Sequence, residues 1–174
     1  RLAFEDVNYW TELTEIIDWS MTHVARRMGI CWGAQALMYH LHGVEKYEHP
    51  QKLFGIFEHE LETTQRPAGF LAGFTRRFPM PVSRYTGNKP EAIEQASDLE
   101  ILAQSPESGV AMVVNSKTQD IFVLNHLEYD AETLAEEYRR DRDAGLETAL
   151  PANYFPEDDP HKSPMNSWRP YAFL

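Results

Sequence analysis

The chain has 174 residues, enough for one domain with a substantial core. Its formal net charge of −11, from 16 Lys and Arg against 27 Asp and Glu, argues against a nucleic-acid partner, which would need a basic face. The single cysteine, Cys31, allows no intramolecular disulfide and suits a reducing cytoplasm, and no apolar run approaches the length of a membrane span. We therefore expect one cytoplasmic domain with neither a nucleic-acid nor a membrane partner.

The first half of the chain predicts a helix, a short strand, a second helix and a further strand. Apolar residues recur at helical spacing over residues 10–24. Residues 28–31 are short and apolar, like the end of a buried strand, and the helix that follows over residues 32–41 is expected to end at Gly43. A strand is expected at residues 53–58. Residues 66–88, rich in Pro, Gly and Arg, predict an irregular surface excursion.

The second half predicts three strands, a helix and a tail. The strands are expected at residues 99–104, 110–115 and 121–124, with a polar hairpin turn at 116–120. Asp130 is positioned to cap a helix over residues 131–144 that ends at Gly145, and after Pro151 an extended tail is expected to wrap the domain. Strands interleaved with helices predict an α/β sheet. Only one clear strand-to-helix crossover is present, so we expect the first strands of the sheet to lie upstream of Arg1.

The most informative stretch is residues 29–35, with the order Gly-Ile-Cys-Trp-Gly-Ala-Gln. A nucleophile on a sharp strand-to-helix turn needs small neighbours, and Gly29 and Gly33 stand two residues either side of Cys31. The N-terminus of the following helix favours a thiolate, and the N–H of Trp32 is the natural first oxyanion donor. An isolated cysteine is more often a buried structural residue. The glycines and the strand-then-helix context favour a nucleophile instead.

A cysteine nucleophile needs a base, and the base needs an orienting carboxylate. His126 follows an expected strand and precedes a helix, which places it at the carboxyl edge of the sheet, where α/β sites collect. Glu128 is close enough to accept a hydrogen bond from its ring. Alone, this pair is equally well explained as a surface ion pair; with Cys31 it favours a triad. Solvated or capping roles are expected for His23, His49, His59 and His161, and an awkward approach to Cys31 for His40 and His42.

The Gly-x-Cys-x-Gly-x-Gln order, followed by His-x-Glu at residues 126–128, resembles the class I glutaminase superfamily. Further stretches make the chain more similar to the homoserine O-acyltransferases, the homoserine transsuccinylase family that shares this fold. They are residues 4–10, 30–36, 57–59, 125–130, 133–138, 140–141, 153–156 and 167–169. The resemblance covers essentially the whole chain. It implies that residues 1–174 form one glutaminase-like (flavodoxin-like) α/β domain, the catalytic C-terminal part of a longer enzyme.

This resemblance implies a role for each candidate residue. Cys31 would attack the thioester of an acyl-CoA, His126 would take the proton of the homoserine hydroxyl, and Glu128 would hold the imidazole in the useful tautomer. Substrate-binding roles would fall to Lys52, Ser83 and Arg140. The residue chemistry agrees for Arg140, because its planar fork suits an α-carboxylate. Arg139 and Arg142 are expected to be solvated helix cations.

The resemblance implies transfer of an acetyl or succinyl group from acyl-CoA to L-homoserine, in methionine biosynthesis, by a cytoplasmic homodimer. Acyl-CoA is then a co-substrate, and neither a resident cofactor nor a metal is expected. The sequence leaves the acyl donor open. Two alternatives remain: a class I glutamine amidotransferase domain that hydrolyses glutamine through the same residues, and a non-catalytic binding module on the same fold.

Overall fold

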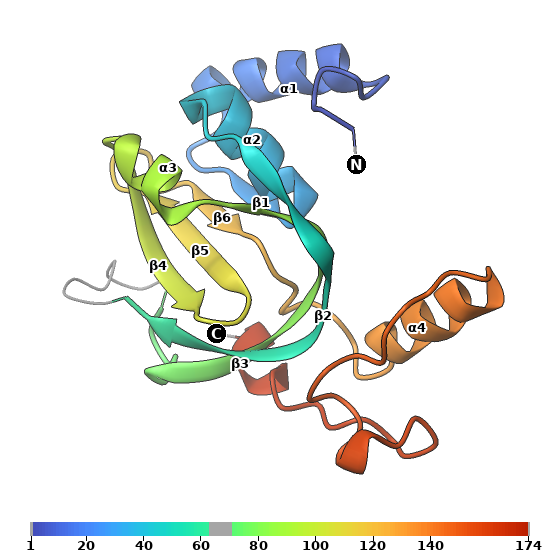
Figure 1. The fold of residues 1–174 in the computed structure, drawn as a ribbon. Helices are drawn as coiled ribbons and strands as arrows, with labels where there is room; N and C mark the ends of the chain where they lie inside the picture. The colour runs from blue at the N-terminus through green and yellow to red at the C-terminus, as the bar shows by residue number, and fades with distance from the viewer. Residues whose placement is uncertain (1, 63–70, 174) are drawn as a thin grey trace.

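The computed structural model describes residues 2–62 and 71–173, which contain one mixed sheet with helices packed against it (Figure 1). In chain order, the elements are α1 (Trp10–His23), β1 (Met28–Ile30), α2 (Trp32–His42), β2 (Lys46–Leu61), β3 (Arg77–Asn88), α3 (Pro90–Gln95), β4 (Leu99–Ser105), β5 (Gly109–Asn115), β6 (Ile121–Val123), α4 (Thr133–Asp143), and the 3-10 turns η1 (Pro156–Asp158) and η2 (Arg169–Phe173). Within the described residues, no helix is both long enough and apolar enough to traverse a bilayer.

The sheet has the strand order β1-β6-β5-β4-β2-β3. β1 runs parallel to β6, with Gly29 opposite Phe122, and the remaining pairs are antiparallel. Because β1 and β6 are parallel neighbours, the residues that follow both strands emerge at the same edge of the sheet. This edge carries Cys31 after β1 and His126 shortly after β6.

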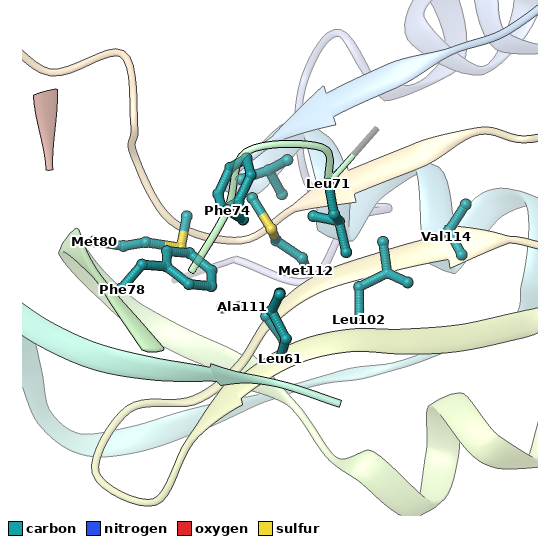
Figure 2. Packing of buried hydrophobic residues seen from close by; sticks show 11 residues of the cluster. Leu61, Leu71, Phe74, Phe78, Met80, Leu102, Ala111, Met112 and Val114 are labelled. Carbon is teal, nitrogen blue, oxygen red and sulfur yellow. The ribbon is translucent and has the colours of Figure 1, made fainter. Parts of the chain in front are cut away.

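Both faces of the sheet are covered. On one face, α2 and α3 pack over side chains that include Val113 and Phe122. On the other face, Met112 and Val114 join a cluster with Phe74 and Phe78 (Figure 2). Met112, Val113 and Val114 of β5 therefore alternate between the two clusters, as the two-residue period of a strand requires. Because both faces of β5 are covered, residues 110–114 form a continuous apolar run in the sequence.

The C-terminal tail packs against β2 and α4 as expected. Ala152 lies opposite Gly55 of β2 in a parallel bridge: its N–H donates to the carbonyl of Phe54 at 2.9 Å, and its carbonyl accepts from the N–H of Ile56 at 2.8 Å. Tyr154 and Trp168 are both fully buried and share a cluster with Leu134 of α4. The tail thereby fixes α4 against the outer part of the sheet, and α4 carries one of the residues predicted to bind substrate.

The prediction of an irregular excursion over residues 66–88 is wrong for residues 77–88, which form β3 and pair with β2; residues 66–70 lie outside the described part. The prolines at positions 79 and 81 argued against a strand in this segment. A proline cannot donate to a ladder, but β3 is the last strand in the sheet order, where one side needs no donor. The short helix α3 was not expected, although Pro90 at its first turn is a common helix start.

Asp130 does not cap α4 with its side chain, contrary to the prediction. The helix begins at Thr133, and the residue in the cap position is Glu132, whose side chain makes no capping bond. Asp130 contributes its backbone carbonyl, which accepts from the Thr133 N–H, while its carboxylate pairs with Arg169 of the tail at 3.2 Å. The helix end is as expected, because Gly145 has a φ of 74° just past the last turn.

Candidate active site

Cys31 occupies the turn between β1 and α2 with a backbone that few residues adopt. Its φ is 51° and its ψ is −117°, and it stands in the N-cap position of α2. Its N–H donates to the carbonyl of Val123 at 2.7 Å, and its own carbonyl accepts from the N–H of Gln35 at 3.2 Å. A strained backbone that is held from both sides presents the thiol at the sheet edge, as in a nucleophile elbow.

The two glycines beside the elbow differ in what they contribute. A Cβ built on Gly29 would lie 2.7 Å from the Cα of Ala34, so only glycine lets β1 approach α2 this closely. A Cβ on Gly33 would meet nothing within 4 Å. The expectation that both glycines relieve crowding is therefore right for Gly29 and wrong for Gly33.

His126 and Glu128 meet as the sequence predicts. Nδ1 of the His126 ring lies 2.6 Å from a carboxylate oxygen of Glu128. The backbone N–H of His126 donates to the backbone carbonyl of Pro81 at 3.0 Å. The imidazole stacks on the ring of Tyr129, with centroids 4.1 Å apart and planes 19° from parallel. Backbone, carboxylate and ring stacking together fix the orientation of the imidazole.

The electrostatics join this pair to the thiol. Burial lowers the pKa of His126, but hydrogen bonds with the side chains of Cys31 and Glu128 outweigh it and raise that pKa to about 9. Attraction to an anionic Cys31 and to Glu128 acts in the same direction. Glu128 therefore contacts His126 directly, and the pKa of His126 depends on Cys31 as well, as expected for a nucleophile, a base and an orienting carboxylate.

His40, His42 and His59 have side-chain partners away from Cys31. His40 pairs with Asp18 at 2.7 Å, and His42 lies 3.4 Å from the amide of Asn115. The solvated or capping role predicted for His59 is wrong, because this side chain is 1% exposed and contacts Ser108 and Asn125. Burial lowers its pKa to about 4, so the ring is neutral under ordinary conditions. His59 sits on β2, where alternation of the strand turns it inward.

A second polar group brings together the residues predicted to bind substrate. One carboxylate oxygen of Glu137 accepts from Nζ of Lys52 at 2.8 Å and from the hydroxyl of Ser83 at 2.8 Å. The same oxygen lies 3.5 Å from the guanidinium of Arg140, which also pairs with Asp141 at 2.6 Å. Side chains from β2, β3 and α4 thus converge, although they are far apart in the sequence.

Sequence reasoning missed Glu137 and Asp141, the acids of this second group. Asp141 is 5% exposed and lies 3.1 Å from Nζ of Lys52, so both acids balance cations that the resemblance had singled out. The signal was the spacing on α4, because Glu137 stands three residues before Arg140 and four before Asp141, and both spacings place side chains on neighbouring positions of a helix. Arg139 behaves as predicted, since its side chain is 61% exposed and pairs with Glu132.

A cavity of about 440 Å³ lies in front of the nucleophile. Cys31, Trp32 and Gln35 of the elbow line it, and so do Ser83 and Arg84 of β3. Trp32 is the first residue of α2, where backbone N–H groups have no partner within the helix. In residues 2–62 and 71–173, no group of three or more His, Cys, Asp or Glu side chains is arranged to hold a metal ion.

Solved structures define the class of fold first. A glutamine amidotransferase from Thermotoga maritima matches with a TM-score of 0.65 and 15% identity, covering 83% of this chain and 60% of that one. Another from Methylobacillus flagellatus matches with a TM-score of 0.63 and 17% identity, covering 93% and 59%. The chain therefore has the class I glutamine amidotransferase-like fold, as predicted.

Sequence comparison then gives the family. The family model described as Homoserine O-succinyltransferase matches residues 1–174. A "Homoserine O-acetyltransferase" of Brevibacillus brevis is 48% identical over 174 residues, which are 100% of this chain and 56% of the relative. A "Homoserine O-succinyltransferase" of Pelagibacterium halotolerans is 47% identical over 174 residues. The chain belongs to the homoserine O-succinyltransferase family and spans about 56% of the length of these relatives.

Proposed function

We propose that this chain carries the catalytic centre of a homoserine O-acyltransferase, which transfers an acetyl or succinyl group from acyl-CoA to the hydroxyl of L-homoserine. The observation that carries the proposal is the contact of His126 with Glu128, together with the dependence of the His126 pKa on the elbow cysteine Cys31, in a chain of this family. The cavity beside Cys31 is also lined by Ser83, so both polar groups border the space in which a substrate would bind.

The first half of the reaction uses the pair as thiolate and imidazolium. A pKa of about 9 keeps the His126 ring protonated near neutral pH, and this charge favours an anionic Cys31. The thiolate attacks the thioester carbonyl of acyl-CoA, and the N–H of Trp32 stabilises the oxyanion. The carbon–sulfur bond to CoA then breaks, and the leaving CoA thiolate takes the proton from His126. The acyl group remains on Cys31 as a thioester.

Acylation itself prepares the base for the second half. Once Cys31 is a thioester, it can no longer be the anion whose hydrogen bond and charge raise the pKa of His126. The neutral imidazole then accepts the proton of the homoserine hydroxyl as its oxygen attacks the acyl carbon. The bond to sulfur breaks, the O-acyl ester leaves, and thiolate and imidazolium are restored. Glu128 holds the ring throughout.

The second polar group suits a zwitterionic amino acid. Arg140 is 68% exposed at its side chain and presents a planar fork to an α-carboxylate. The carboxylate of Glu137 can accept from the α-ammonium group, with Lys52 and Ser83 holding it in place. In the absence of substrate, the four charges of Lys52, Arg140, Glu137 and Asp141 balance one another.

A CoA-release assay tests the proposal. The protein is incubated with acetyl-CoA or succinyl-CoA, with and without L-homoserine, and a thiol reagent reports free CoA. Homoserine-dependent release with formation of O-acyl-homoserine is expected. The likeness to glutamine amidotransferases gives the second candidate, a glutaminase. Release of ammonia from glutamine without homoserine-dependent CoA release would favour that candidate and contradict the acyltransferase.

The family membership supports further proposals about the whole protein. We propose that it works in the cytoplasm as a homodimer in methionine biosynthesis, with acyl-CoA and homoserine as its small-molecule partners. We also propose that the reaction needs neither a metal nor a resident cofactor, because thiolate and thioester exchange without either. Light scattering tests the dimer, and activity that survives dialysis against EDTA tests the absence of a metal.

A further inference from the structure

Arg84 of β3 is a charged side chain in an unusual setting. Its relative exposure is 6%, and among the described residues its hydrogen-bond acceptors are uncharged. Nε donates to the side-chain carbonyl of Asn125 at 3.2 Å, and Nη1 donates to the carbonyl of Thr86 at 2.9 Å. Nη2 donates to the carbonyls of Ser108 and Val110, at 2.5 and 3.1 Å. Each of the three guanidinium nitrogens donates at least one hydrogen bond, but none of these acceptors carries a negative charge that would neutralise the cation.

Arg27 shows how this fold otherwise buries an arginine. Its guanidinium donates to the carboxylate of Asp120 through Nε at 2.9 Å and through Nη2 at 2.5 Å, and Asp120 is 1% exposed. Burying a charge without an opposite charge costs several kcal/mol, on the order of the whole stability of a small domain. At Arg27 an ion pair with a carboxylate offsets this cost. At Arg84, in the described part of the chain, only hydrogen bonds to uncharged acceptors do so.

The charge of Arg84 acts on the nucleophile. Arg84 and Cys31 line the same cavity of about 440 Å³. Burial lowers the pKa of the Arg84 guanidinium, and attraction to an anionic Cys31, followed by Tyr47, opposes this. A thiolate at position 31 is therefore the first of the anions that balance this buried cation.

The same arginine is also tied to the base. Asn125, which accepts from Arg84, directly precedes His126, and its amide lies 2.9 Å from Nε2 of His59. His59 in turn lies 2.9 Å from the hydroxyl of Ser108, whose backbone carbonyl accepts from Arg84. The guanidinium therefore cannot swing away to solvent or toward a substrate, and its charge stays fixed beside the site.

We propose that Arg84 is an electrostatic positioning residue of the acyl-transfer site, which rests on the proposed function: its fixed buried charge stabilises the thiolate of Cys31 and the anionic tetrahedral intermediates formed there. It acts on the reacting atoms through its effect on Cys31. Four of its five N–H groups donate to the protein, so we propose that it contributes mainly through the field of its charge.

The pH dependence of alkylation at Cys31 by iodoacetamide measures this effect, since only the thiolate reacts. Mass spectrometry of the labelled peptide identifies the site in the complete protein. Besides Arg84, the titratable groups around the thiol are His126, Glu128 and Tyr129 after β6, Tyr85 of β3, Lys46 of β2, and Tyr9. They are unchanged in the variants below, so a difference between variants reports the charge at position 84.

Three variants separate charge from structure. Arg84→Gln removes the charge, and we expect the midpoint of the alkylation profile to rise by about one pH unit or more. Arg84→Lys keeps the charge and should retain most of the wild-type midpoint. Arg77→Gln removes a charge from an exposed side chain of the same strand, paired with Glu60, and should leave the midpoint unchanged. A wild-type midpoint in folded Arg84→Gln, or equal shifts in Arg84→Lys and Arg84→Gln, would overturn the proposal.

Asn125→Asp provides a second test of the proposal if Arg84→Gln does not fold. The new carboxylate would stand where Nε of Arg84 already donates, and would neutralise the guanidinium without changing the shape of the site. The midpoint is again expected to rise, and an unchanged midpoint contradicts the proposal. Alkylation requires neither acyl-CoA nor homoserine, so its outcome is independent of the CoA-release assay: either result can fail while the other holds.

Discussion

The two polar groups of the site are built in different ways. The group of Cys31, His126 and Glu128 is fixed largely by backbone: the thiol sits on a turn with a φ of 51°, and the histidine is held by a backbone bond to Pro81. The group around Glu137 is held by side chains from β2, β3 and α4. The difference matches the proposed tasks, because covalent chemistry needs fixed geometry, whereas a binding site must exchange its internal ion pairs for those of a substrate.

Cys31→Ser should have the largest effect on activity. Loss of the thiolate removes the attacking group itself, and we expect homoserine-dependent CoA release to fall by at least about 10⁴-fold. The backbone is unchanged, so the midpoint of thermal unfolding should stay close to that of the wild type. Release within about tenfold of wild type would show that the covalent group is elsewhere.

Glu128→Gln should cost less, because it removes the orienting carboxylate and leaves the nucleophile and the base. Acyl transfer is expected to fall by about 10- to 10⁴-fold. NMR titration should find the pKa of His126 near 9 in the wild type and lower in the variant. A folded-state pKa above the ordinary 6.5 means that His126 stabilises the wild type fully below about pH 6.5 and that this contribution disappears as pH rises through about 9.

That loss can be measured as a fall in the free energy of unfolding between these two pH values, and Glu128→Gln should make it smaller. An unchanged His126 pKa in the variant would contradict the assigned partnership. Such a result would also weaken the proposal that acylation of Cys31 lowers the pKa of His126 and makes it a base.

Glu137→Gln should separate the two groups. We expect KM for homoserine to rise by about 10- to 100-fold, the equivalent of one buried charged hydrogen bond. The rate at which acyl-CoA acylates Cys31 should remain close to that of the wild type. Glu136→Gln, at the exposed neighbouring position of α4, is the matched control. Equal losses in acylation and in transfer would show that the two groups are not functionally distinct.

Gly29→Ala and Gly33→Ala should have the smallest effects, and they test how the elbow is built. The new methyl at 29 would overlap the backbone of Ala34, and we expect the free energy of unfolding to fall by about 1–3 kcal/mol. At 33 there is open space within a helix, so stability should be unchanged or higher by up to about 1 kcal/mol. Denaturant unfolding measures both. Equal losses would mean that the elbow does not depend on close approach at Gly29.

The sequence revealed the first group more fully than the second, for a physical reason. A nucleophile elbow is local: Gly29, Cys31 and the start of α2 lie within a few residues, so their pattern can be read directly. Lys52, Ser83 and Arg140 came only from the family resemblance, because their common partner Glu137 lies on a different element from Lys52 and Ser83. No local sequence pattern indicates that an acidic side chain will be buried by tertiary packing.

The wrong predictions for residues 77–88 and for His59 also have a non-local cause, because tertiary contacts decide both. Residues 77–88 looked irregular because Pro79 and Pro81 argue against a strand, and only their place at the edge of the sheet makes the pairing with β2 acceptable. His59 looked like a surface residue because its neighbours at 58 and 60 are acidic. Its burial depends on which face of β2 turns toward Ser108 and Asn125, which the sequence of β2 alone does not specify.

The central claim is that Cys31 carries the acyl group between two substrates. The most direct test is intact-protein and peptide mass spectrometry after incubation with acetyl-CoA or succinyl-CoA and rapid acid quenching. We predict one acyl group per chain, on the peptide that contains Cys31, and its disappearance when L-homoserine is added before the quench, with O-acyl-homoserine in the supernatant. Homoserine-dependent turnover without an acyl group on Cys31, or with an acyl group on another side chain, would contradict the account.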